Sequence, residues 1–206
     1  MPLLRISKQG APRDHPPRPR IAPLAQPLPE PLAAAMARLV PPGMVPPQLF
    51  LTVARNEGLF RFLVDSGLIG PTGLLDRRAL ARELRECIVL RTCVATGCDY
   101  EFNLHVQTIS ARMGLSPAQI DDVRRAQPDP ALWSPRQHAA LLLVDAAVRR
   151  VVDDATYAAC REQFDEATLI EITQLAGLYV GVAMQVALAL PTFDRYLPGE
   201  PIRATA

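Results

Sequence analysis

Proline is very unevenly distributed along this chain. Of its 21 prolines, 13 lie within residues 1–47. Proline fixes φ and lacks an amide donor, so a segment this rich in it cannot form one long helix. We expect residues 1–47 to be an extended or polyproline II arm, with a short helix around Leu32–Leu39. Such an arm is either flexible, wrapped on the protein's own surface, or extended to a neighbouring subunit.

From residue 48 onward the pattern changes to helical. Apolar residues recur at intervals of three and four, no long stretch alternates with period two, and alanine and leucine are frequent. At 206 residues the chain is long enough for one domain with a substantial core. We therefore predict an all-α fold of about eight helices over residues 48–192, followed by a tail over residues 193–206.

Several helix boundaries can be read directly from the sequence. Two segments, Ser116–Gln119 and Ser134–Gln137, each place serine at the N-cap, proline at the next position and glutamine at the third helical position. Gly97 and Gly114 are typical helix ends. The pattern predicts an apolar helical face from Leu49 to Leu63. It also predicts six helices. In chain order these are a helix capped by Asp76 that runs to about Thr96, Cys98 to Met113, 117–127, 135–151, a short helix that starts at Asp153 or Asp154, and a helix from Asp165 to about Leu190.

Composition excludes some broad functional classes. The formal net charge is only +1, so the sequence does not predict nucleic-acid binding. The four cysteines form no CxxC pair and no zinc-binding spacing, which favours a reducing, cytoplasmic location. Residues 1–10 lack the apolar run of a secretory signal. The apolar segment Leu169–Leu190 is interrupted by polar residues, so we expect a core or subunit-interface helix rather than a membrane span.

A cluster of proton-handling residues is the main chemical feature. Cys98, Glu101 and His105 are spaced at i, i+3 and i+7, which would place them on one face of a helix, and Glu86 lies in the preceding helical segment. His105 is a natural proton donor near neutral pH. Glu101, one turn away, can orient the imidazole or raise its pKa, and Glu86 can complete a proton relay. The alternative is a structural Glu–His hydrogen bond between packed helices.

Cys98 and the other candidate residues allow more than one interpretation. Cys98 is either an inert buried thiol or, near His105 and a helix N-terminus, a partial thiolate. Three ligands on one helix would be a weak metal site, so we predict none. Arg91, in an apolar stretch, needs a partner: an ion pair with Glu86 or Glu101, or a substrate carboxylate. Tyr100 either lines a substrate pocket or packs.

The stretch RELRECIVLRTCVATGCDYEFNLHV, over residues 82–106, resembles the carboxymuconolactone decarboxylase and alkylhydroperoxidase D superfamily. The following ARMGLSPAQIDDVR is also similar, and RIAPL and LFLTVARNEGLFRFLVDSGLIG resemble the longer decarboxylase-like members. The likeness covers most of residues 20–190. It implies an alkylhydroperoxidase D-like helical bundle, a homo-oligomer with sites near subunit contacts, and a small-molecule substrate.

One departure from the alkylhydroperoxidase pattern matters. In that branch a glutamate is followed after eleven residues by CxxC and, three residues later, by histidine. Glu86, Cys98 and His105 match, but Glu101 stands where the peroxide-attacking cysteine would be. A two-cysteine cycle needs a resolving thiol within disulfide reach, so the Glu101–His105 pair instead resembles the decarboxylase branch.

The resemblance thus implies a lyase or isomerase acting on a small organic acid or lactone. Decarboxylation requires stabilisation of an enolate and delivery of a proton to carbon, and neither step requires a metal or organic cofactor. We predict Glu86, Cys98, Glu101 and His105 as catalytic and Arg91 and Tyr100 as substrate-binding. Two alternatives stay open: a thiol-dependent hydroperoxidase that uses Cys98, and a helical oligomer without activity.

Overall fold

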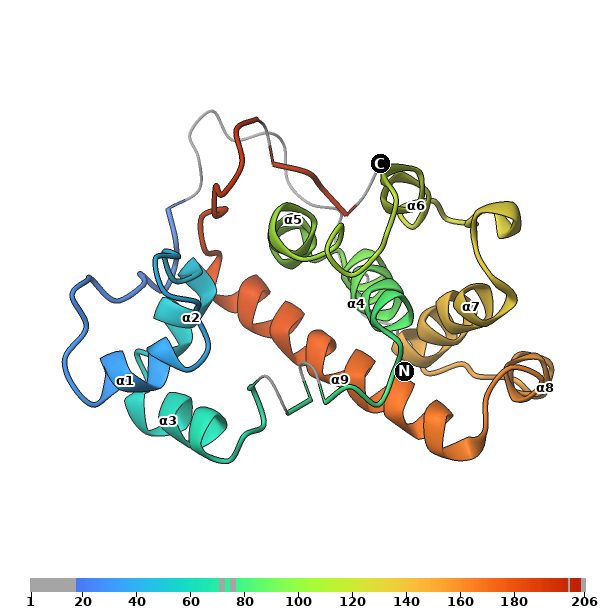
Figure 1. Ribbon diagram of the computed structural model, residues 1–206, viewed down its shortest axis with the longest axis horizontal. Coiled ribbons are helices and arrows are strands. Elements are labelled where there is room, and N and C mark those ends of the chain that lie inside the picture. Colours follow the sequence, from blue (N-terminus) through green and yellow to red (C-terminus); the bar gives the residue numbers. More distant parts are fainter. Residues whose placement is uncertain (1–17, 71–72, 75–76, 200, 205–206) are drawn as a thin grey trace, which may run out of the picture.

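The computed structural model describes residues 18–70, 73–74, 77–199 and 201–204. Within these ranges the chain is all-helical and contains no strand, which confirms the predicted fold class (Figure 1). The helices, in chain order, are α1 (Leu32–Ala37), α2 (Gln48–Val53), α3 (Glu57–Asp65), α4 (Arg82–Thr96), α5 (Asp99–Thr108), α6 (Pro117–Asp122), a 3₁₀ turn (Pro130–Leu132), α7 (Pro135–Arg149), α8 (Asp154–Arg161) and α9 (Glu166–Ala189).

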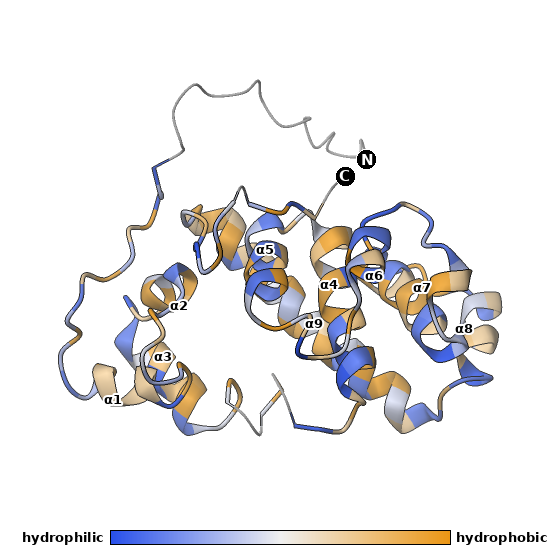
Figure 2. Ribbon diagram, turned by 45° about the horizontal axis from the view of Figure 1, so that its top comes forward, coloured by the Kyte–Doolittle hydropathy of each residue, from blue (hydrophilic) through white to orange (hydrophobic). Residues whose placement is uncertain are grey.

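Helix α4 is the centre of the main core. It packs against α5, α7 and α9, and ten consecutive residues, 84–93, are buried. Figure 1 shows α4 between these helices, and Figure 2 shows hydrophobic residues along α4, α7 and α9. Gly97 ends α4 in the left-handed conformation, with φ +65°, as its position in the sequence predicted. Because residues 84–93 of α4 are buried, polar residues among them must find partners inside the protein.

The predicted helix starts are mostly present. Ser116 and Ser134 each form a complete capping box with the glutamine three residues later. Asp153 and Asp165 accept hydrogen bonds from Thr156 and Thr168 at the starts of α8 and α9. Each of these starts depends on contacts within four residues, so sequence alone is enough to find it.

Other predicted boundaries are wrong. The face expected from Leu49 to Leu63 is split into α2 and α3, because the Asn56 side chain caps α3 by accepting from the Leu59 amide. Phe62, which lies within that span, is exposed, and the buried residues of α3 are Phe60 and Val64. Asp76 lies outside the described residues, and α4 begins at Arg82. Helix α5 ends at Thr108, before the predicted Met113.

The N-terminal helices form a second, smaller core. Helices α1, α2 and α3 bury a cluster of apolar side chains that includes Leu32, Met36, Leu51 and Phe60. This cluster joins residues on both sides of the predicted domain boundary at residue 47, so packing does not break there. The preceding segment is extended, and its backbone is attached to the protein: the amides of Arg20 and Ile21 donate to the Ala189 carbonyl.

Helix α9 is long and largely apolar. Among the described residues, α9 is the helix that is long and apolar enough to cross a membrane. About a third of the residues in its apolar stretch are buried in the protein. That buried part packs against α4, α5 and α7. The outer face carries Ile170, Met184 and Leu188, each more than 60% exposed. One side of α9 therefore belongs to the core and the other is apolar surface.

Candidate active site

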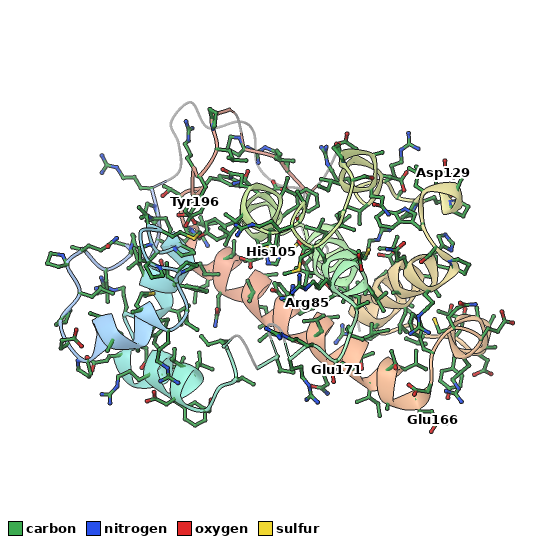
Figure 3. All side chains as sticks on the ribbon, viewed as in Figure 1. Arg85, His105, Asp129, Glu166, Glu171 and Tyr196 are labelled. Carbon is green, nitrogen blue, oxygen red and sulfur yellow. The ribbon has the colours of Figure 1, made fainter. Side chains whose placement is uncertain are left out.

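His105, on α5, is the centre of a buried polar cluster between α4, α5 and α9. Its Nδ1 lies 2.9 Å from Glu86 Oε1. Its Nε2 lies 3.4 Å from Glu101 Oε1 and 3.2 Å from the Tyr179 hydroxyl. Figure 3 labels His105 and Arg85 in the region between these three helices. The imidazole therefore contacts a carboxylate on each side.

Glu86 is completely buried on α4 and contacts His105 through the ring nitrogen Nδ1, on the opposite side of the ring from Glu101. Besides the imidazole, Glu86 Oε1 accepts a 2.7 Å hydrogen bond from the Ser110 hydroxyl, and Oε2 lies 3.4 Å from Arg85 Nη1. A buried carboxylate must be paired and hydrogen-bonded, and these three contacts meet that requirement. Glu86 thus fixes the ring orientation and directs Nε2 towards Glu101 and Tyr179.

The two residues stabilise each other's charged forms. Burial by itself raises the pKa of Glu86, but the charge and hydrogen bond of His105 outweigh it, and the pKa is lowered overall. Burial likewise lowers the pKa of His105, yet the charge of Glu86 and the hydrogen bonds to Glu101 and Glu86 raise it to about 9. At neutral pH the site therefore contains an imidazolium between two carboxylates.

Tyr179 and Arg85 complete the cluster, and neither was predicted from the sequence. Arg85 Nη2 donates to the Tyr179 hydroxyl over 3.4 Å, and the Tyr179 ring stands edge-on to the His105 ring at 5.4 Å between centroids. Burial raises the pKa of Tyr179, so the phenol is neutral. The sequence offered one signal for Tyr179, which is the single tyrosine of the apolar helix α9. Its position opposite α5, however, depends on tertiary packing.

A cavity of about 500 Å³ opens beside this cluster. Glu101, His105, Tyr179 and Arg85 line its polar end, and α1–α3 with their connections supply much of the remaining wall. Glu86 is not among the lining residues and acts from behind His105. The predicted acid–imidazole pair one turn apart, Glu101 and His105, thus faces a hollow of the size that holds a small organic ligand.

The structure corrects the prediction for Cys98. This residue is the N-cap of α5, not part of the helix, so it does not share the helical face of Glu101 and His105. It is 4% exposed, belongs to the main hydrophobic core and does not line the cavity. Burial raises the pKa of its thiol to about 12, so the partial thiolate expected from its position is not formed.

The structure also places Arg91 away from the cavity. The prediction that Arg91 pairs with Glu86 or Glu101 is wrong. Its guanidinium binds Asp145 on α7 through two contacts of 2.8 and 2.5 Å. It also donates to the carbonyls of Val123 and Arg125, both at 2.7 Å. Its donors are therefore used to join α4 to α7 and to the segment after α6, and Arg91 does not line the cavity where the substrate-binding role would place it.

Tyr100 packs in the interior and does not contact the cavity. Its hydroxyl donates a short hydrogen bond to Asp194 and accepts one of 2.9 Å from the Leu49 amide. Asp194 in turn accepts from the Gln48 amide at 3.1 and 3.2 Å. Tyr100 therefore joins α5 to the start of α2 and to the C-terminal segment, which corrects its predicted role in binding substrate.

Within the described ranges, no group of three or more His, Cys, Asp or Glu side chains is placed to bind a metal ion. The set considered from the sequence, Cys98, Glu101 and His105, forms no such group because Cys98 is turned into the core. What the cluster provides is a proton donor, His105, next to a carboxylate, Glu101, and a phenol, Tyr179.

The fold of the chain resembles that of known structures. Two crystal structures of the debrominase Bmp8, one without ligand and one of a Cys-to-Ala variant with 2,3,4-tribromopyrrole, share the fold with TM-scores of 0.63 and 0.65. Both are 18% identical to this chain, and the alignments cover 85% of it and 92% of Bmp8. No curated protein matches the chain.

The third comparison concerns the sequence itself. Residues 71–146 match the profile described as the carboxymuconolactone decarboxylase family. The matched segment contains α4, α5, α6 and most of α7, and with them Glu86, Glu101 and His105. Residues 71–146 of this chain therefore belong to the carboxymuconolactone decarboxylase family.

Proposed function

We propose that this protein is a lyase or isomerase that performs acid–base chemistry on a small organic acid or lactone. The observation that carries the proposal is the position of His105 between Glu86 and Glu101 at the polar end of a cavity of about 500 Å³. Buried acid–base groups that perturb one another in a cleft are typical of catalytic sites. The family of the 71–146 segment supports the same reading.

In the proposed reaction each group has a separate role. In a decarboxylation, the bond between the carboxyl carbon and the α-carbon breaks, CO₂ leaves and the electron pair forms an enolate. The Tyr179 hydroxyl can stabilise the enolate oxygen, and His105 Nε2 delivers the proton to carbon. In an isomerisation, Glu101 instead removes the first proton. Glu86 keeps the ring oriented and stabilises its charged form in both cases.

Replacement of His105 tests the proposal. The assay is turnover of β-keto acids and unsaturated lactones, followed by loss of substrate absorbance. We expect His105→Gln to lower kcat at least 100-fold, since general acid–base catalysis contributes about 10² to 10⁴. Helix content measured by circular dichroism should not change.

His138, on α7, gives the matched control, because it is outside the cavity lining. His138→Gln should leave turnover unchanged. If His105→Gln turns over substrate as fast as the unaltered protein, His105 has no part in the reaction and the proposal fails.

The thiol-dependent hydroperoxidase is the alternative, and it receives less support. It requires an accessible thiolate, whereas Cys98 is buried with a raised pKa. Peroxide consumption with a thiol reductant, compared between the unaltered protein and Cys98→Ser, separates the two activities. The non-catalytic alternative is disfavoured by the cavity itself, since His105 would then be enclosed by packed side chains.

We also infer a homo-oligomer in the cytoplasm. The exposed apolar face of α9, with Ile170, Met184 and Leu188, supports the first inference, because large exposed apolar patches mark interaction surfaces. The four buried, unpaired cysteines support the second. Sedimentation velocity of the unaltered protein and of Met184→Glu would test the assembly, with dissociation expected for the variant.

A further inference from the structure

The wall of the cavity opposite the catalytic cluster is almost entirely apolar. It is built from the second core and the loops around it, and its side chains include Leu39, Met44, Phe50, Leu63 and Ile69. Leu104, Leu178 and Val182 extend the apolar surface along α5 and α9 towards the cluster. A ligand that fills this space must therefore place most of its surface against hydrocarbon.

The polar end does not carry the net positive charge that a polycarboxylate would need. With His105 protonated, its charge and that of Arg85 equal the charges of Glu86 and Glu101 in number. At the rim, Arg38 is paired with Asp65 at 2.6 Å, and the exposed Arg112 donates a short hydrogen bond to the Thr108 carbonyl, which carries no compensating charge. The rim thus retains the positive charge of Arg112 in contact with solvent, whereas the charges at the buried polar end balance. A dianion at the polar end would be buried beside the Glu101 carboxylate with no excess positive charge next to it, which is costly.

The hydrogen-bonding capacity of the cluster points to a head group that both donates and accepts. Glu101 is 7% exposed, and its Oε2 has no hydrogen-bond partner among the described residues. This atom can only accept. The Tyr179 oxygen already receives a donor from Arg85, so its own hydrogen is available to a ligand oxygen.

We propose that the cavity binds a predominantly apolar molecule with a single uncharged head group of the enol or phenol type, whose O–H donates to Glu101 and whose oxygen accepts from Tyr179. This inference rests on the proposed function, because the enol is the species that remains at the polar end after CO₂ has left a β-keto acid. It specifies an alkyl- or aryl-substituted substrate in place of a small polycarboxylate.

Binding of 4-alkylphenols, from ethyl to hexyl, tests the inference by isothermal titration calorimetry. These probes mimic an enol and are not substrates for decarboxylation. Each methylene that enters the cavity should strengthen binding roughly fourfold, from the free energy of burying one CH₂. The corresponding 4-alkylanisoles, which lack the O–H, should bind at least tenfold more weakly, because Glu101 would remain unpaired. Adipate, a dicarboxylate, should show no binding.

Two neighbouring residues on α3 provide matched variants. Leu63 lines the cavity, whereas Phe62 is 63% exposed and does not. Leu63→Gln should weaken binding of 4-hexylphenol at least tenfold, and Phe62→Gln should not change it. Equal effects of both variants would show non-specific association and overturn the inference. So would tighter binding of adipate, or an affinity that does not depend on chain length.

Failure of the proposed ligand class and failure of the proposed chemistry give different results. If the phenols bind as expected and His105→Gln leaves turnover of every substrate unchanged, the cavity is an apolar binding site without the assigned chemistry. If turnover depends on His105 but adipate binds better than the phenols, the chemistry stands and the substrate class is wrong.

Discussion

At the scale of single residues, the proton on His105 Nε2 is the one that the proposed reaction transfers to the substrate. Nδ1 is committed to Glu86, so only Nε2 can serve a substrate, and Glu101 and Tyr179 are the groups that compete for it. The surrounding carboxylates keep the ring charged through neutral pH. The site is consequently prepared to donate a proton first and to act as a base only after that proton has left.

This charge state predicts a loss of stability at alkaline pH. The pKa of His105 is raised to about 9 in the folded protein from about 6.5 when unfolded. Its contribution is therefore fully present below pH 6.5 and disappears as pH rises through 9. We expect urea unfolding to show roughly 1–3 kcal/mol less stability at pH 9.5 than at pH 6.5, from about 1.4 kcal/mol per pKa unit.

In His105→Gln this difference should shrink, because the titrating group is absent. A lowered pKa of Glu86 acts in the opposite range: its contribution is lost as pH falls below the usual carboxylate pKa. An NMR titration that placed the His105 pKa below 7 would contradict the charge state described for the site.

The sequence was sufficient for part of this cluster and misleading for another part. Glu101 and His105 are one turn apart in any helix, so their proximity follows from spacing alone. Cys98 was assigned to the same face on the assumption that it lies inside the helix, but as the N-cap its side chain follows a different direction. Tyr179 is 74 residues from His105, and only tertiary packing brings the two together.

At the scale of elements, local signals predicted helix starts well and long-range contacts poorly. The Ser-Pro starts of α6 and α7 depend on four consecutive residues and were located correctly. The break between α2 and α3 depends on a single asparagine cap, which the apolar periodicity conceals. Arg91 was known to need a partner, but Asp145 is 54 residues away on α7 and no local pattern indicates it.

The correction for Arg91 makes a prediction about α4. Arg91→Met leaves Asp145 without its partner and frees the carbonyls of Val123 and Arg125, so we expect a loss of about 3–5 kcal/mol in unfolding free energy. Turnover per folded molecule should stay within about twofold.

Arg125 carries the matched control, since its side chain is 66% exposed and pairs weakly with Asp122. Arg125→Met should cost less than about 1 kcal/mol. A large increase in KM for Arg91→Met, without loss of stability, would instead restore the substrate-binding role expected from the sequence.

At the scale of the whole molecule, the cavity lies between two separately packed cores. The family segment supplies the acid–base groups on α4 and α5, and the N-terminal helices supply the apolar wall. Few direct helix contacts join the two halves. The wall is held by a third apolar cluster, in which Leu49 packs against Tyr100 and Leu104. It is also held by the C-terminal segment, where Asp194 and Tyr100 together bind the first amides of α2.

This attachment predicts that removal of the Tyr100 hydroxyl, which lies outside the catalytic cluster, changes the position of the apolar wall. Tyr100→Phe removes the acceptor of the Leu49 amide and the donor to Asp194, so the start of α2 should detach more often. We expect faster hydrogen exchange over residues 48–53, a stability loss of about 1–3 kcal/mol, and a raised KM with little change in kcat. Tyr157→Phe, on the exposed surface of α8, is the control and should change none of these. Exchange over residues 48–53 as slow as in the unaltered protein would mean that the apolar wall is held by its own packing, and that the two cores do not depend on this contact to enclose the cavity.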